Sequence, residues 1–71
     1  MKELSFLAAD EESLYFIPEN IILEAAENED GTTTLAIVDV INVKSHIDDV
    51  RKEISKRQRD RILWHTLSQP S

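Results

Sequence analysis

The sequence predicts a small α+β fold, in which an antiparallel β-meander of four or five short strands is followed by one C-terminal amphipathic helix. Two observations predict it. Residues 4–43 hold short runs of β-branched and aromatic side chains separated by turn signals, as in strands and hairpins. Residues 45–65 instead place apolar side chains at helical spacing among charged ones. We expect one domain at 1–67 and a frayed C-terminal tail at 68–71, because 71 residues suffice for one domain at most.

The first two strands are predicted at "LSFLA" (4–8) and "SLYFI" (13–17). The acidic segment between them suits a hairpin loop, since the Asp10 side chain can accept a hydrogen bond from the backbone nearby. The segment "PEN" (18–20) ends the second strand. Pro18 has no amide hydrogen and suits a turn or the first position of a short helical turn.

A second hairpin is predicted around Asp30 and Gly31, because glycine accepts a positive φ without steric cost. The segment "IILEAAE" (21–27) precedes this turn. The segment "TTTLAIVDVINV" (32–43) follows it and is dense in Thr, Val and Ile, which favour strands. Asp39 indicates a bulge or a tight turn, with a further short strand after it.

The helix at 45–65 is predicted from its first turn and its apolar stripe. Ser45 can cap the helix, and Asp48 follows three residues later, near the positive end of the helix dipole. The apolar stripe consists of Ile47, Val50 and Ile54. Because the stripe then becomes polar, we expect the helix to pack on the sheet through its first half and afterwards to project or turn.

Charge is distributed unevenly along the chain, whose net charge is -6. Residues 1–30 hold nine acids and one base, a net -8, whereas residues 51–71 hold six bases and two acids, a net +4. The candidate acidic surface consists of Glu11, Glu12, Glu27, Glu29 and Asp30. The candidate partner-binding residues are Arg51, Lys52, Lys56, Arg57, Arg59, Arg61, Ile62, Leu63 and Trp64.

The basic stretch has three interpretations. It is the solvated face of a helix, a segment that docks onto an acidic surface of a partner or of a second copy, or a contact for phosphates. The negative net charge and the lack of aromatic residues among the basic ones disfavour nucleic acid. Trp64, with Ile62 and Leu63 beside it, either packs on the domain's own sheet or forms a small hydrophobic handle for an interface.

Enzymatic chemistry finds little support in these residues. The chain has no Cys, and its two histidines, His46 and His65, lack the spacing of a zinc pair. One glycine cannot supply a phosphate-binding loop. We therefore expect no enzyme, no metal and no cofactor. No signal peptide is evident and no apolar run approaches the roughly 20 residues of a membrane span, so we expect a cytoplasmic protein without a membrane partner.

The order of segments resembles one known family. An aromatic strand runs into "LYFIPENI", a hairpin follows in "LEAAENEDGTTTLAI", and "INV" precedes "KSHIDDVRKEISKRQR". In this layout residues 4–58 resemble the small flagellar-operon proteins of the FlbD type, also called SwrD. The matching positions are Phe16, Pro18, Asn20, Ile21, Glu24, Thr34, Leu35, Val43, Ser45, Val50 and Ile54.

The chain departs from the FlbD pattern in two places. It has "VDV" where the family has a glycine before the last strand, and the segment "DRILWHTLSQPS" is extra. The resemblance implies a non-enzymatic accessory role in bacterial motility and no catalytic residues. We therefore expect a small regulatory or adaptor protein that acts through protein-protein contacts and forms a homo-oligomer. The alternatives are a nucleic-acid-binding regulator that uses residues 51–61 and an acidic inhibitor of the phage type that mimics nucleic acid.

Overall fold

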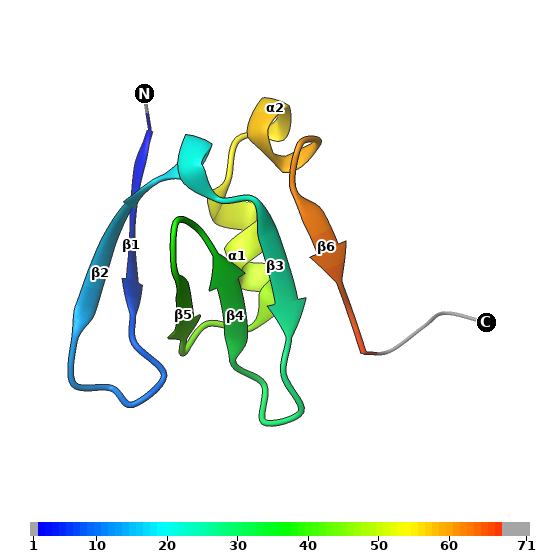
Figure 1. The fold of residues 1–71 in the computed structure, drawn as a ribbon. Helices are drawn as coiled ribbons and strands as arrows, with labels where there is room; N and C mark the ends of the chain where they lie inside the picture. The colour runs from blue at the N-terminus through cyan, green and yellow to red at the C-terminus, as the bar shows by residue number, and fades with distance from the viewer. Residues whose placement is uncertain (1, 68–71) are drawn as a thin grey trace.

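The chain folds as a small α+β protein with one two-stranded sheet and one four-stranded sheet, as the computed structural model shows for residues 2–67 (Figure 1). The elements are β1 (Glu3–Leu7), β2 (Leu14–Pro18), the 3-10 turn η1 (Glu19–Ile21), β3 (Glu24–Glu27), β4 (Thr33–Ala36), β5 (Val40–Val43), α1 (Ile47–Glu53), α2 (Lys56–Arg59) and β6 (Leu63–His65).

The two sheets are joined at one corner. Strands β1 and β2 form an antiparallel hairpin, and the larger sheet has the order β5-β4-β3-β6. An antiparallel bridge links Ala8 to Val43, and the N–H of Lys44 donates to the carbonyl of Leu7 at 2.8 Å. Strand β5 therefore lies beside the end of β1, while β2 has no neighbour except β1 among residues 2–67.

The predicted turns form for the expected reasons. In the β1–β2 loop, Asp10 Oδ1 accepts a hydrogen bond from the backbone N–H of Glu12 at 2.9 Å. Gly31 has a φ of 88° in the β3–β4 turn. A residue with a side chain would be strained in this conformation, whereas glycine adopts it freely. Pro18, predicted in a turn or at the first position of a short helical turn, is instead the last residue of β2 and the N-cap of η1, with φ -64° and ψ 131°.

The core lies between α1 and the inner faces of both sheets. The apolar stripe of α1 is buried, with Ile47 at 1%, Val50 at 0% and Ile54 at 1% exposure. It packs with residues from both sheets, and the other members of this cluster are Leu4, Phe6, Ile17, Ile22, Ala25, Leu35, Val43 and Ile62. Figure 1 shows α1 behind the larger sheet and no helix in front of it.

The predicted single helix at 45–65 is wrong beyond Glu53. Ile54 leaves the helix with φ -92° and ψ 137°, and its side chain stays in the core. A continued helix would carry the polar residues after Ile54 into that core, so the chain turns instead. It then forms the single turn α2 and the strand β6, which pairs parallel with β3.

The predicted cap of α1 is also wrong by one residue. His46 is the cap, and its Nδ1 accepts the backbone N–H of Asp48 at 3.2 Å. Ser45 is used differently, since its carbonyl accepts the hydroxyl of Thr33 at 2.8 Å. The frayed tail predicted at 68–71 lies outside the described residues. No helix among residues 2–67 is both long enough and apolar enough to cross a membrane.

We predict that Leu35→Ala lowers the free energy of unfolding by about 2–5 kcal/mol, because it removes buried methyl groups and leaves a cavity. Leu35 is 0% exposed, whereas Leu23 is 61% exposed. Leu23→Ala is therefore the matched control and should cost less than about 0.5 kcal/mol. Urea unfolding of both variants measures the difference. Equal losses of unfolding free energy in the two variants would contradict the placement of Leu35 in the core and of Leu23 at the surface.

Candidate functional site

The outer face of the β1–β2 hairpin carries three exposed apolar side chains beside the polar Glu3 and Ser5. Side chains alternate along each strand, so Leu4 and Phe6 enter the core while Leu7 points outward. In β2, Leu14 and Phe16 point outward and are 59% and 66% exposed, against 37% for Leu7. Leu7 lies opposite Leu14 in the ladder. We call Leu7, Leu14 and Phe16 the hairpin face.

The outer edge of β2 has backbone groups without a hydrogen-bond partner among residues 2–67. The N–H of Ala8 donates to the carbonyl of Ser13 at 2.8 Å, and the N–H of Glu19 donates to the carbonyl of Lys2 at 3.0 Å. Odd-numbered residues of this strand thus bond towards β1. By the alternation of an antiparallel ladder, the N–H and C=O groups of Leu14 and Phe16 point away from β1. We call this row of groups the β2 edge.

The β2 edge lacks the features that usually block an edge strand. Exposed edges are commonly protected by charged side chains, bulges or proline. The run 13–18, "SLYFIP", contains no charged residue in a chain that is 31% charged, and its proline stands at the very end. The hairpin face and the β2 edge together form a surface suited to pairing with another strand.

Sequence reasoning missed this surface, although a signal was present. Consecutive apolar residues, Phe6 with Leu7 and Tyr15 to Ile17, place apolar groups on both faces of a strand. A hairpin with only one face against the core must then expose the other set. The candidate residues that were predicted lie elsewhere: the partner-binding set runs from α1 through α2 to β6, and the acidic set lies in the two turns and at the end of β3.

Several of the predicted basic residues are held within the molecule. The guanidinium of Arg51 lies 4.8 Å from the centre of the Trp64 ring. The indole N–H of Trp64 donates to the carbonyl of Arg59 at 3.0 Å, and the Arg59 guanidinium donates to the carbonyl of Ile54 at 3.0 Å. These contacts fold Trp64 back against the core.

The other members of the basic stretch do not form one surface with Trp64. Ile62 is buried, whereas Leu63 is 60% exposed, so the expected hydrophobic handle is divided between core and solvent. Lys56 pairs with Asp60 across one helical turn at 3.4 Å. The exposed bases for which no contact is found within residues 2–67 are Lys52, Arg57 and Arg61.

The predicted acidic residues divide between two turns. Glu11 and Glu12 lie in the β1–β2 loop, where Glu11 pairs with Lys44 at 3.8 Å. Glu29 and Asp30 lie in the β3–β4 turn. Both turns lie at the lower end of the molecule in Figure 1, and α2 lies at the upper end. The fold therefore separates acidic turns from a basic helix.

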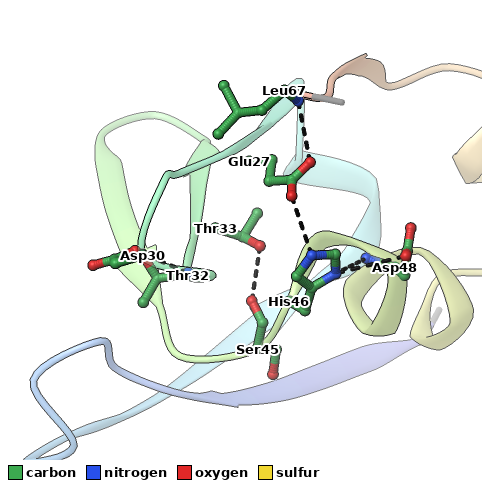
Figure 2. Close-up of polar contacts among 8 residues, drawn as sticks. All are labelled: Glu27, Asp30, Thr32, Thr33, Ser45, His46, Asp48 and Leu67. Carbon is green, nitrogen blue, oxygen red and sulfur yellow. Dashed lines mark hydrogen bonds and ion pairs between the residues drawn. The ribbon is translucent and has the colours of Figure 1, made fainter. Parts of the chain in front are cut away.

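Asp30 is occupied within its own turn. Its Oδ1 accepts both the backbone N–H and the hydroxyl of Thr32 (Figure 2). The hydroxyl bond and then the backbone bond hold the pKa of the Asp30 carboxyl below its ordinary value of 3.8. Its main contacts thus stabilise the turn that Gly31 makes possible.

Glu27 and His46 fasten three parts of the chain together (Figure 2). Glu27 Oε2 lies 3.1 Å from His46 Nε2, and Glu27 Oε1 accepts the backbone N–H of Leu67 at 3.1 Å. The Glu27 side chain is only 15% exposed. The pair thus connects β3, the start of α1 and the segment after β6. Sequence spacing gave no signal of it, since the two residues are 19 apart.

Both ring nitrogens of His46 have polar partners. Nδ1 accepts the backbone N–H of Asp48 at 3.2 Å, and Nε2 lies 3.1 Å from Glu27 Oε2. Among residues 2–67 no group of three or more His, Cys, Asp or Glu side chains is arranged to hold a metal ion.

Glu19 joins the end of β2 to the start of α2. Its carboxylate accepts the backbone N–H of Ser55 at 2.9 Å and also the Ser55 hydroxyl. The hydroxyl bond and then the backbone bond hold the pKa of the Glu19 carboxyl below its ordinary value of 4.5. The contact sets α2 directly beyond the end of the hairpin.

We predict that the Glu19 contact makes stability depend on acid. Because folding lowers this pKa, the stabilising contribution is present above pH 4.5 and is lost as the pH falls through the folded-state pKa. Thermal unfolding at pH 7 and pH 3 should show a larger loss of Tm for the wild type than for Glu19→Gln, which cannot titrate. Ser55→Ala removes the hydroxyl that donates to Glu19, so its loss of Tm between pH 7 and pH 3 should also be smaller than that of the wild type. Identical pH profiles for all three would contradict the contact.

We predict that His46→Ala lowers the free energy of unfolding by about 1 kcal/mol, because it removes a helix cap and the partner of Glu27. His65→Ala is the control, since His65 meets Glu24 at 3.3 Å with both side chains at least half exposed. That exposed pair should contribute less than about 0.5 kcal/mol. Urea unfolding at pH 7 measures both. A loss from His65→Ala as large as that from His46→Ala would be inconsistent with these assignments.

Comparison with known proteins gives no family for the chain. No protein-family model matches it, and searches of curated proteins and of solved structures found no match either. The resemblance of residues 4–58 to the FlbD type therefore stays a prediction.

Proposed function

We propose that this chain is a non-enzymatic regulatory or adaptor protein that acts through protein-protein contacts and associates with itself. The observation that carries the proposal is the hairpin face lying beside the β2 edge. Contiguous apolar surface next to unpaired strand groups is the usual composition of a strand-pairing interface. We place this function in the cytoplasm, since the chain has no cysteine for disulfides.

The size of the surface predicts weak association. Complete burial of a leucine or phenylalanine side chain stabilises by about 1.5–3 kcal/mol. Two copies would bring together two pairs of Leu14 and Phe16, and these side chains are already partly covered. Association itself costs about 4–15 kcal/mol in lost freedom of motion. The net affinity is therefore small, and the oligomer should dissociate on dilution.

The contacts of the basic stretch support this proposal over the nucleic-acid alternative. Arg51 and Arg59 are engaged with Trp64 and with backbone carbonyls. Acidic side chains lie among the remaining bases on the same two helices, namely Asp48, Asp49, Glu53 and Asp60. A phosphate-binding surface needs a connected positive field, which this mixture does not provide. The FlbD-like layout of residues 4–58 points in the same direction, towards an accessory protein without an active site.

We predict that light scattering of the wild type shows a concentration-dependent dimer, and that Phe16→Lys shifts it to monomer. A lysine on the exposed edge strand places two like charges at the contact and disfavours pairing. Val38→Lys is the matched control, because Val38 is 99% exposed on the β4–β5 turn and the charge change is the same. A wild type that is monomeric at every concentration, in low and in high salt, would overturn the proposal.

A further inference from the structure

We propose that a second copy of this chain occupies the β2 edge, with the two β2 strands antiparallel about a two-fold axis beside Tyr15. The inference rests on the proposed self-association and adds the surface and the register. Three features of the molecule carry it: the free groups of the edge, the apolar side chains beside them, and the charges at the two ends of the hairpin.

The backbone selects the register. Leu14 and Phe16 each direct one N–H and one C=O outward, whereas Pro18 has no N–H. When Leu14 pairs with the partner's Phe16, the two-fold axis repeats the pair, and all outward groups of both residues are bonded. A register centred on Phe16 would place Pro18 opposite Leu14 and leave the Leu14 carbonyl without a donor. The first register therefore uses the edge completely.

The same register covers the exposed side chains. Opposite residues in an antiparallel ladder project on the same face, so Phe16 lies against the partner's Leu14 and Leu14 against the partner's Phe16. Both side chains are more than half exposed in the single chain. Pairing joins the two hairpin faces into one strip across the dimer, in which each row runs from Leu7 through Leu14 and the partner's Phe16 to the partner's Ser5.

The charges identify a second copy as the occupant. At the loop end of the hairpin stand three acids, Asp10, Glu11 and Glu12, and Lys44 lies 3.8 Å from Glu11. At the other end stand Lys2 and α2, which the Glu19–Ser55 contact sets beyond β2. An antiparallel pair brings the acidic loop of each copy to the basic end of the other, twice by symmetry.

The basic end is available for this contact. The Lys56 side chain is 84% exposed, and Arg57 is exposed beside it. Three acids, Glu3, Glu19 and Asp60, also lie at this end, and Asp60 pairs with Lys56 at 3.4 Å, so Arg57 is the base of this pair that has no contact within residues 2–67. Opposite charges near the surface attract modestly and specify orientation more than affinity.

A charge-swap experiment tests the arrangement. The loop variant is Glu11→Lys with Glu12→Lys, and the helix variant is Lys56→Glu with Arg57→Glu. Each alone places like charges at both ends of its own dimer, so each should sediment as a monomer where the wild type is dimeric. An equimolar mixture restores both attractions and should sediment as a heterodimer. The control, Glu24→Lys with Glu29→Lys, carries the same charge change as the loop variant, on β3 and in the β3–β4 turn, and should dimerise like the wild type.

The outcomes separate the arrangement from self-association itself. If the wild type dimerises but the mixture does not, or if both variants dimerise as well as the wild type, the antiparallel β2 arrangement is overturned while self-association stands. A dimer that survives Phe16→Pro, which removes an outward N–H without touching the bonds to β1, overturns it too. If the wild type is monomeric, both the proposed self-association and the β2 arrangement that rests on it are overturned. Circular dichroism confirms that each variant is folded.

Discussion

The packing of both sheets on one short helix is the constraint on which the rest of the structure depends. Helix α1 spans Ile47–Glu53, and with Ile54 it supplies the buried stripe beneath the two sheets. Among residues 2–67 no second layer of helix covers the opposite face. In this part of the chain the outer faces of both sheets face solvent, and the outer side of β2 has no partner strand. Because one short helix covers only the inner faces of the sheets, the hairpin keeps an exposed surface that is suited to self-pairing.

The polar residues that look most functional in the sequence mainly hold the elements together. Glu19 joins β2 to α2, Glu27 joins β3 to α1 and to the segment after β6, and Arg51 packs on Trp64. Each contact links segments that are distant in sequence, and these contacts add to the stability that a small hydrophobic core provides. These three residues are thus structural, whereas Lys52, Arg57 and Arg61 are exposed and make no contact that is found within residues 2–67. The exposed acidic side chains of the two turns and the exposed basic side chains of α2 lie at opposite ends of the molecule. Such a separation of charge orients a partner more than it adds affinity.

The local features of the fold could be predicted from the sequence, and its long-range pairings could not. The loop around Asp10, the turn at Gly31 and the helical turn after Pro18 depend on neighbours within a few residues. The end of α1 and the strand β6 depend on distant partners, namely Glu19 for Ser55 and β3 for Trp64. Periodicity carries no information about such pairs, so residues 54–65 were expected to continue a helix. The candidate site was missed for a related reason, because burial of one face of β2 is decided by α1.

Amide hydrogen exchange tests the pairing of β2 most directly. The N–H groups of Tyr15 and Ile17 face β1, while those of Leu14 and Phe16 point away from it. We expect the N–H groups of Tyr15 and Ile17 to be protected at every protein concentration, and those of Leu14 and Phe16 to become protected only as the concentration rises. Rapid exchange of Leu14 and Phe16 at concentrations where the protein is a dimer would contradict it, because the edge would then be free in the associated state.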